Sequence, residues 1–237
     1  IGQYLITATV ATDGDDIVLE HYATAALYVG HAGDDSGWPL PCASCHDDKV
    51  VGWTATGHAT MFTEAIDGLK SSHYNEGCIQ CHTLGYDTAP GAVNDGFDDI
   101  AAMVGWSFPE TLEPGNWDAM DPALQAKANI QCENCHGPAS EHSGRTMMNE
   151  ISVSTSSGDC AQCHDEQPYH VKNLEWNNSR HAVATRYPTG EERRRSCVRC
   201  HSGLGFIDYT DGLAQDDFRF EYEAIVCAAC HDPHALD

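Results

Sequence analysis

The chain has 237 residues, of which 12 are Lys or Arg and 36 are Asp or Glu, so its formal net charge is −24 at pH 7. An acidic surface of this kind is repelled by phosphate backbones, which argues against a nucleic-acid partner. No apolar run approaches the length of about 20 residues that a membrane-spanning helix needs. The first residues also lack the basic and apolar regions of a signal peptide, so we expect a mature chain without a membrane span.

The N-terminal stretch is predicted to be extended. Residues Ile1–Ala11 mix β-branched and polar side chains without helical spacing, which favours a strand. No partner strand is obvious nearby in the sequence. The stretch is interpreted either as an ordinary edge strand or as part of an arm, residues 1–30, that adds to a neighbouring subunit.

The rest of the chain is organised by the motif Cys-x-x-Cys-His, which occurs six times. The six copies, motifs 1 to 6 in chain order, use the cysteine pairs Cys42 and Cys45, Cys78 and Cys81, Cys132 and Cys135, Cys160 and Cys163, Cys197 and Cys200, and Cys227 and Cys230. Such motifs attach haem c through both thiols. The adjacent histidine becomes the proximal iron ligand, which predicts this role for His46, His82, His136, His164, His201 and His231. One copy could be half of a zinc site or a redox dithiol, but six complete copies without a spare cysteine favour six covalent haems.

Six haems would leave roughly 40 residues for each, too few for the polypeptide alone to enclose them. We therefore expect a continuous haem stack to form much of the core. All twelve cysteines would be committed to haem, so no disulfide remains. Haem is attached to such motifs outside the cytoplasmic membrane, which predicts an extracellular or periplasmic protein.

Helical signal is short and broken. Thr60–Leu69 and Ala119–Asn129 are predicted helices, the second with Asp121 as the N-cap before Pro122. Stretches rich in Gly, Pro, Asp and Ser predict long loops at Ala32–Pro41, Ala89–Asp99 and Val153–Asp159. The expected fold class is therefore mainly irregular, with short α-helices and few strands. Residues 31–237 would form one hexahaem domain, and the uneven motif intervals predict no strict repeat.

Eight histidines lie outside the motifs and are candidate distal ligands: His21, His31, His58, His73, His142, His170, His181 and His234. With six irons and only five methionines, six of these eight are the simplest ligand set; a solvated surface histidine is the alternative for each. His73 lies five residues before motif 2. His21 and His31 are the least constrained, so either could reach a haem on another subunit or bind no iron.

Three of these candidates have informative spacings. His142 and His170 each follow a proximal histidine by six residues, which suggests one local loop used twice. His234 follows His231 by three residues, too close to reach the other face of its own haem. It is therefore expected to bind a neighbouring haem, which would hold two haems close together.

Bis-histidine ligation has a consequence for the chemistry. A Met ligand raises a haem's reduction potential, so haems with two His ligands should have low potentials. No iron then needs an open face, and we do not expect an enzyme. Calcium is a further possible ligand, because the segments Asp13–Asp16 and Asp95–Asp99 are rich in carboxylates, although neither matches a full calcium-binding loop.

The basic residues are unevenly placed. None occurs before Lys49, and seven of the twelve are Lys172, Arg180, Arg186, Arg193, Arg194, Arg195 and Arg199. One interpretation pairs these groups with haem propionates, for which guanidinium is well suited. The other is that the acidic N-terminal part of one subunit meets the basic region of the next.

Several segments resemble a known family. Gly77–Tyr86 and Gln131–His142 are similar to the multihaem cytochrome c family that includes the tetrahaem carriers of ammonia oxidisers. The same likeness extends to Cys197–Ile207 and Cys227–His234, and the segments around His58 and His181 resemble distal-ligand segments. Less specifically, the chain resembles extracellular cytochromes that polymerise into conductive filaments. That resemblance implies stacked haems and an axial histidine from an adjacent subunit.

The leading hypothesis is long-range electron transfer through six bis-histidine haems in a filament of this chain. It would exchange electrons with redox partner proteins or extracellular acceptors. Two ends of unlike charge suit head-to-tail contacts that do not close into a ring. The alternative is a soluble periplasmic shuttle. A reductase of nitrogen or sulfur oxyanions is less favoured, because Arg193–Arg195 is the only hint of an anion site.

Overall fold

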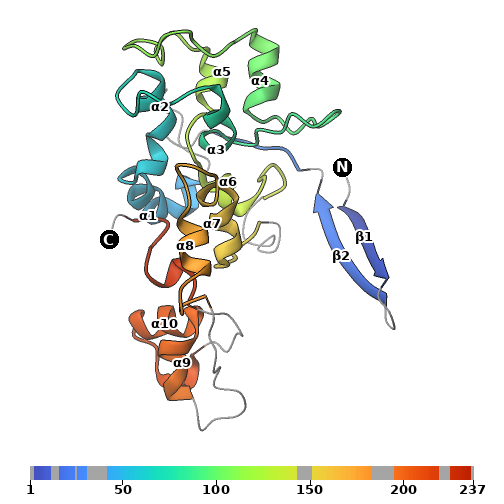
Figure 1. The fold of residues 1–237 in the computed structure, drawn as a ribbon, viewed down its shortest axis with the longest axis vertical. Coiled ribbons are helices and arrows are strands. Elements are labelled where there is room, and N and C mark those ends of the chain that lie inside the picture. Colours follow the sequence, from blue (N-terminus) through green and yellow to red (C-terminus); the bar gives the residue numbers. More distant parts are fainter. Residues whose placement is uncertain are drawn as a thin grey trace.

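The computed structural model of the chain describes residues 3–11, 16–24, 26–30, 42–142, 151–182, 195–218 and 225–235. Over these residues the backbone forms short helices joined by loops, with one two-stranded sheet (Figure 1). The predicted class of fold, short helices and loops with few strands, is therefore confirmed. The stack of six haems inside it stays a prediction.

The α-helices are α1 (Ala43–Thr54), α2 (Met61–Ile66), α3 (Ile79–His82), α4 (Phe97–Val104), α5 (Pro122–Gln125), α6 (Cys132–His136), α7 (Ser157–His164), α8 (Lys172–Asn177), α9 (Arg195–His201) and α10 (Gly203–Thr210). Single turns of 3-10 helix are η1 (Gly57–Ala59), η2 (Glu76–Cys78), η4 (Gln215–Asp217) and η5 (Cys227–Ala229). Each Cys-x-x-Cys-His motif coincides with a helical turn. Since residues i and i+4 share one helix face, this turn places the first thiol and the histidine on the same side.

The N-terminal strand has a partner, contrary to expectation. β1 (Gln3–Ala11) pairs antiparallel with β2 (Asp16–Thr24), with Gln3 opposite Thr24 and Ala11 opposite Asp16. The prediction of a strand is confirmed, and the expectation that no partner strand lies nearby in the sequence is wrong. The sequence signal for the pairing is Asp13-Gly14, a frequent hairpin-turn pair that also suits an oxygen-rich loop. In Figure 1 the hairpin stands apart from the helices.

The predicted helices are real but shorter than expected. α2 ends before Gly68, whose φ of +75° is left-handed and stops the helix. α5 begins as predicted, because the side chain of Asp121 accepts the N–H of Ala123 and Pro122 takes the first turn. Two of the predicted loops end inside helices, since α4 starts at Phe97 and α7 at Ser157; Ala32–Pro41 lies outside the described residues.

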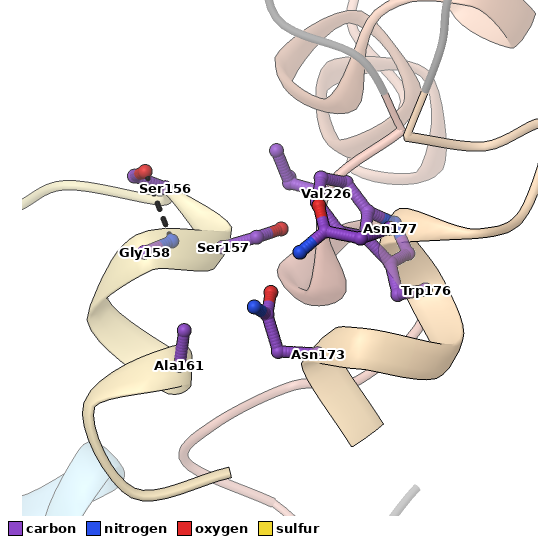
Figure 2. Close-up of a pocket in the computed structure, with 8 residues that line it drawn as sticks. All are labelled: Ser156, Ser157, Gly158, Ala161, Asn173, Trp176, Asn177 and Val226. Atoms are coloured by element: carbon purple, nitrogen blue, oxygen red, sulfur yellow. Dashed lines mark hydrogen bonds between the residues drawn. The ribbon is translucent and has the colours of Figure 1, made fainter. Parts of the chain in front are cut away.

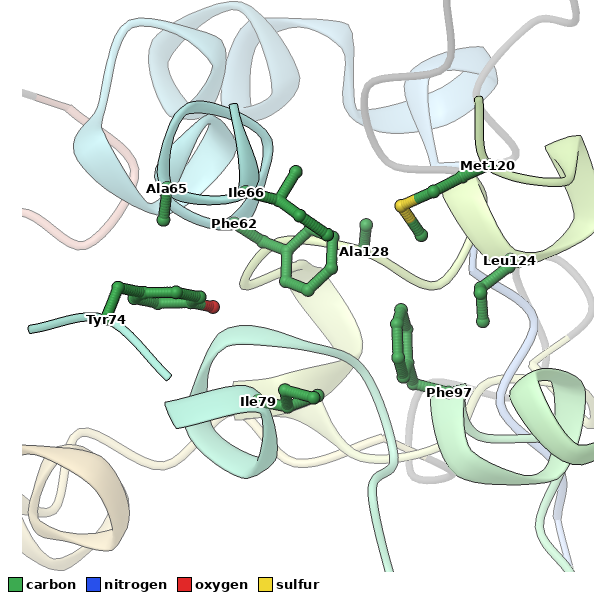
Figure 3. Packing of buried hydrophobic residues seen from close by; sticks show 9 residues of the cluster. All are labelled: Phe62, Ala65, Ile66, Tyr74, Ile79, Phe97, Met120, Leu124 and Ala128. Carbon is green, nitrogen blue, oxygen red and sulfur yellow. The ribbon is translucent and has the colours of Figure 1, made fainter. Parts of the chain in front are cut away.

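A hydrophobic cluster surrounds motif 2 (Figure 3). Its buried members are Phe62, Ala65, Ile66, Tyr74, Ile79, Phe97, Met120, Leu124 and Ala128. Phe62 and Phe97 are fully buried, and their rings meet edge to face with centroids 5.3 Å apart. The cluster draws on α2, α3, α4 and α5. Side chains therefore form a core of their own in this part of the chain.

The segment Ala26–Gly30 is tied to motif 3. Glu133, within that motif and only 5% exposed, accepts backbone N–H groups of Val29, Gly30 and Ala139. Lys127 donates to the carbonyl groups of Tyr28 and Val29. Burial lowers the pKa of Lys127, and the charge of Glu133 opposes that change. Charge-assisted hydrogen bonds of this kind are among the stronger ones in proteins.

Replacing Glu133 with glutamine is expected to loosen this segment. Both carboxylate oxygens accept backbone N–H groups. In glutamine one of these oxygens is replaced by an NH₂ group, which would face a backbone N–H that also donates. We expect a local loss of about 2 kcal/mol, seen as roughly 30-fold faster hydrogen exchange at Val29 and Gly30. Glu110→Gln, at an exposed position, is the control and should change nothing at these amides. Unchanged exchange in Glu133→Gln would contradict the anchoring role.

Candidate haem-binding site

Cysteines of different motifs meet in pairs. The hydrogen-bonded thiol pairs are Cys42 with Cys132, Cys81 with Cys163, and Cys160 with Cys227. They join motif 1 to motif 3, motif 2 to motif 4, and motif 4 to motif 6. Motif 5 is linked through α10, which packs against both α9 and η5. Porphyrins attached at paired thiols would be neighbours, because each thioether bond starts from one of these sulfur atoms.

The thiol pairs also change acidity. A hydrogen bond from Cys132 lowers the pKa of Cys42 to about 7, and one from Cys163 lowers that of Cys81 to about 7. Burial, followed by the nearby thiols of Cys227 and Cys135, raises the pKa of Cys160 to about 11. The last effect places Cys135 of motif 3 close to motif 4. The motifs therefore form one connected group.

Histidines outside the motifs face proximal histidines at a recurrent distance. Two imidazoles on opposite faces of one iron have ring centroids roughly 6 Å apart, since each metal–nitrogen bond is about 2 Å and the ring centre lies about 1 Å behind the nitrogen. The ring pairs at such a distance are His82 with His170 at 6.1 Å, His58 with His164 at 6.1 Å, His164 with His170 at 6.1 Å, and His136 with His234 at 6.0 Å. Among the described rings His58 has this relation to His164 alone. If each outside histidine pairs with one motif histidine, His170 is then left to His82, and the ring distances allow three such pairs.

Hydrogen bonds orient one of these pairs. His136 donates through Nδ1 to the carbonyl of Ser152. The carboxylate of Asp232 lies 3.5 Å from Nδ1 of His234 and accepts its backbone N–H at 2.8 Å. A histidine held at Nδ1 presents Nε2 to a metal, and such partners fix the ring orientation. The chain therefore prepares both imidazoles of this pair for an iron between them.

His82 is suited to the same chemistry. Burial, and then the neighbouring imidazoles, lower its pKa to about 4, so the ring is neutral at pH 7. The neutral imidazole is the form that binds a metal. Its Nδ1 and that of His142 are buried without a hydrogen-bond partner in the described structure, which marks both rings as incomplete on their own. These residues fit haem iron.

Removing the carboxylate of Asp232 is expected to raise the midpoint potential of one haem. A carboxylate beside Nδ1 increases the basicity of the imidazole and so favours the oxidised iron. Asp232→Asn keeps the size and removes the charge. Spectroelectrochemical titration should show one component moved upward and the others unchanged. Asp211→Asn, on the surface after α10, is the control. A titration curve identical to that of the parent protein would contradict the role of Asp232.

The other candidate distal ligands are placed differently. His73 is exposed, contacts Ser71 through Nδ1, and stacks on Tyr169 with centroids 4.0 Å apart. His181 is exposed. The side chain of His21, in β2, and all of His31 lie outside what the structure describes.

The loops of His142 and His170 are not the same, contrary to the equal spacing. The N–H of His142 bonds to Ala139, three residues back, whereas that of His170 bonds to Glu166, four residues back. Three proximal histidines, His46, His201 and His231, are exposed. None of these three has a ring partner among the described residues.

A cavity of about 380 Å³ adjoins motifs 4 and 6 (Figure 2). It lies between α7, α8 and the chain entering η5, and is lined by Ser156, Ser157, Gly158, Ala161, Asn173, Trp176, Asn177 and Val226. The hydroxyl of Ser157 accepts the N–H of Cys227 at 3.1 Å and lies 3.3 Å from its sulfur. The wall of the cavity is thus joined to the first cysteine of motif 6, and the cavity belongs to this candidate site.

Calcium finds no support. In the loop Asp95–Asp99, the carboxylate of Asp99 accepts the N–H groups of Asn94 and Asp95, and that of Asp98 accepts the N–H of Asp87. Within the described ranges no three His, Cys, Asp or Glu side chains are grouped to hold a free metal ion. The segment Asp13–Asp16 lies outside them, apart from its last residue in β2.

Two of the seven basic residues between Lys172 and Arg199 have partners that the structure describes. Lys172 pairs with Glu175 at 2.9 Å on the surface, and the guanidinium of Arg199 lies 5.4 Å from the ring centre of Tyr209. Arg186, Arg193 and Arg194 fall outside the described ranges. Pairing of these groups with haem propionates or with another subunit stays a prediction.

Comparison with known proteins finds two similarities. Residues 41–105, which contain motifs 1 and 2, match the family described as cytochrome c554 and c-prime. The chain is also 24% identical over 145 residues to multiheme cytochrome MtrA of Shewanella baltica (strain OS185). Together with the six motifs, these two similarities support a multihaem c-type cytochrome. The matched stretch covers 52% of this cytochrome and 41% of that relative, so less than half of the relative is represented. No solved structure matches the chain.

These similarities support haem c as the cofactor. In the part of this cytochrome that the structure describes, the helices are too short or too polar to cross a membrane.

Proposed function

We propose that this cytochrome carries electrons over a long distance through six covalent haems, each held by two histidines. The observation that carries the proposal is the connection of all six motifs by thiol pairs and helix packing. Electron hopping needs closely spaced redox centres, and this arrangement would keep every haem next to another. The haems would supply the redox chemistry, and the chain would position them.

Three axial pairs are assigned from the ring distances. They are His82 with His170, His164 with His58, and His136 with His234. In each pair the two histidines come from distant parts of the sequence, so ligation would lock the chain as well as the iron. The haems on His46, His201 and His231 would draw on the remaining candidates.

This ligand set favours a carrier over an enzyme. An iron with imidazoles on both faces has no free position for a substrate. Paired His ligands would also keep the potentials low. The chain's net charge of −24 adds to this effect, because surrounding negative charge favours the more positive, oxidised iron.

The test is a haem count combined with a spin-state measurement on the native protein. We expect a mass that corresponds to six haems per chain, a reductive titration that takes up six electrons, and only low-spin iron by electron paramagnetic resonance. A lower count would overturn the six-haem assignment. High-spin iron that binds nitrite would instead favour an oxyanion reductase.

We further propose that the protein polymerises head to tail, in an extracellular or periplasmic setting. The separate N-terminal hairpin suits contacts between copies, and so does the charge distribution, with an acidic N-terminal part and seven of the twelve basic residues between Lys172 and Arg199. Negative-stain electron microscopy of native protein tests this, with long uniform fibres expected. Discrete particles of one chain with low-spin haems would favour the soluble periplasmic shuttle.

A further inference from the structure

The six motifs form two sets of three that match in order. Motifs 1 and 4 share Cys-Ala-x-Cys-His-Asp. Motifs 2 and 5 are followed by Thr-Leu-Gly and Ser-Gly-Leu-Gly, and motifs 3 and 6 share Ile-x-Cys-x-x-Cys-His-x-Pro. The matching segments are Cys42–Asp47 and Cys160–Asp165, His82–Gly85 and His201–Gly205, and Ile130–Pro138 and Ile225–Pro233. The hydroxyl residues after motifs 2 and 5, Thr83 and Ser202, are both fully buried.

The same hydrogen-bond arrangement is built twice. In the first set, the indole of Trp53 donates to the carbonyl of Ile130 at 3.0 Å, and the N–H of Ile130 donates to the carbonyl of His58 at 3.1 Å.

In the second set, Trp176 donates to Ile225 at 2.8 Å, and Ile225 donates to His181 at 3.2 Å. In each set the tryptophan precedes its histidine by five residues, and a thiol pair joins the first motif to the third. The chain therefore contains two copies of one three-motif unit, residues 42–142 (the first unit) and residues 160–235 (the second unit).

The two units meet at a junction inside the chain. His58 of the first unit faces the proximal His164 of the second, and Cys81 of the first is hydrogen-bonded to Cys163 of the second. His82 lies at the same junction, facing His170. Five of these junction residues have a counterpart in the other unit: His58, Cys81, His82, Cys163 and His164. All five are buried or half-buried.

The counterparts of these five residues are all exposed. His58 corresponds to His181, because each follows its tryptophan by five residues. By the order of the motifs, the other counterparts are His46 for His164, Cys200 for Cys81, Cys45 for Cys163 and His201 for His82. Each half of the internal junction is therefore presented once more on the surface: His181, Cys200 and His201 on the second unit, and His46 and Cys45 on the first. Figure 1 places α9, which carries two of these counterparts, at one end of the molecule.

We propose that a second copy of this chain repeats the internal junction. His181 of one molecule then faces His46 of the next and completes the axial pair of the haem on motif 1, while Cys200 lies beside Cys45. This inference rests on the six-haem polymer proposed above and names its contact. Because the two faces differ, the contact extends in one direction and does not close on itself.

The test compares two histidines that occupy equivalent positions. His181→Gly in the native, haem-loaded protein is expected to convert fibres to single chains and one haem in six to high spin. His58→Gly is the matched control: one haem in six should become high spin, but the fibres should persist. Added imidazole should restore low-spin iron in His181→Gly without restoring fibres, which shows that the fold is intact. If His181→Gly yields no holoprotein, His181→Met, which keeps a ligand, should form fibres with one haem of raised potential.

The outcomes separate this inference from the function on which it rests. Fibres with only low-spin iron in His181→Gly would overturn the junction and leave the polymer standing. Parent protein that is a single chain with six low-spin haems would overturn both the polymer and the junction, while electron transfer through six haems would hold. Fibres of His181→Met with unchanged potentials would also overturn the assignment of His181.

Discussion

Replacing Gly52 with alanine is expected to leave one haem without its sixth ligand. A Cβ at Gly52, in α1, would lie 2.0 Å from the carbonyl oxygen of His234 and 3.2 Å from its carbonyl carbon. Both are backbone atoms, so the C-terminal segment has to move. The ring of His234, now 6.0 Å from that of His136, would move with it. About one haem in six should then become high spin by electron paramagnetic resonance.

The sign of this effect is informative, because helix propensity predicts the opposite. Alanine inside a helix is favoured over glycine by about 1 kcal/mol, so without the contact Gly52→Ala would stabilise α1. Gly57→Ala is the control, since nothing lies within 4 Å of a Cβ there. It should keep all iron low spin and change stability by less than about 0.5 kcal/mol. A Gly52→Ala protein that is more stable and wholly low spin would show that His234 does not pack on α1.

The Cys-x-x-Cys-His motifs can be recognised from the sequence alone, but the sequence does not show which histidine rings face each other. Cys-x-x-Cys-His spans one helical turn, so the proposed attachment cysteines and proximal histidines can be named from local spacing alone. The three ring pairs join residues far apart in the chain, such as His136 with His234, and depend on how the two units pack. Spacing does indicate that His234 should serve a haem other than its own. It carries no information on which one.

The core near motif 2 shows a similar limit. Its members Phe62, Phe97 and Leu124 come from three short helices separated by loops, so no apolar periodicity runs long enough to reveal it. The small number of residues per haem predicts that haems form much of the core. The 53 residues between Cys78 and Cys132 supply a protein core here, including α4 and α5.

The same extra residues conceal the internal duplication. From Cys78 to Cys132 there are 54 positions, but from Cys197 to Cys227 only 30, and this difference is why the motif intervals look irregular. The intervals from the first to the second motif of each unit, 36 and 37 positions, are nearly equal. Hydrogen bonds of Trp53 and Trp176 to matched isoleucines expose the repeat, because they do not depend on loop length.

Replacing His170 with methionine is expected to raise the potential of one haem by on the order of 0.1 V, within the ~0.8 V range that axial ligands span. A thioether is a weaker donor than imidazole and stabilises the reduced iron. The ring of His170 lies 6.1 Å from those of both His82 and His164. Since His58 also faces His164, the haem that changes should be the one attached at motif 2. Spectroelectrochemical titration should resolve one component at higher potential, with all iron still low spin.

Two further variants decide the assignment. His73→Met changes an exposed histidine that stacks on Tyr169, and the six potentials should stay as they are. His58→Met should raise a different component, that of the haem on His164, so that the double variant with His170→Met shows two raised components. A single raised component in the double variant would mean that both histidines serve one iron. A shift in His73→Met with none in His170→Met would move the ligand of motif 2 to His73, and stacking on Tyr169 would then be broken when the haem is bound.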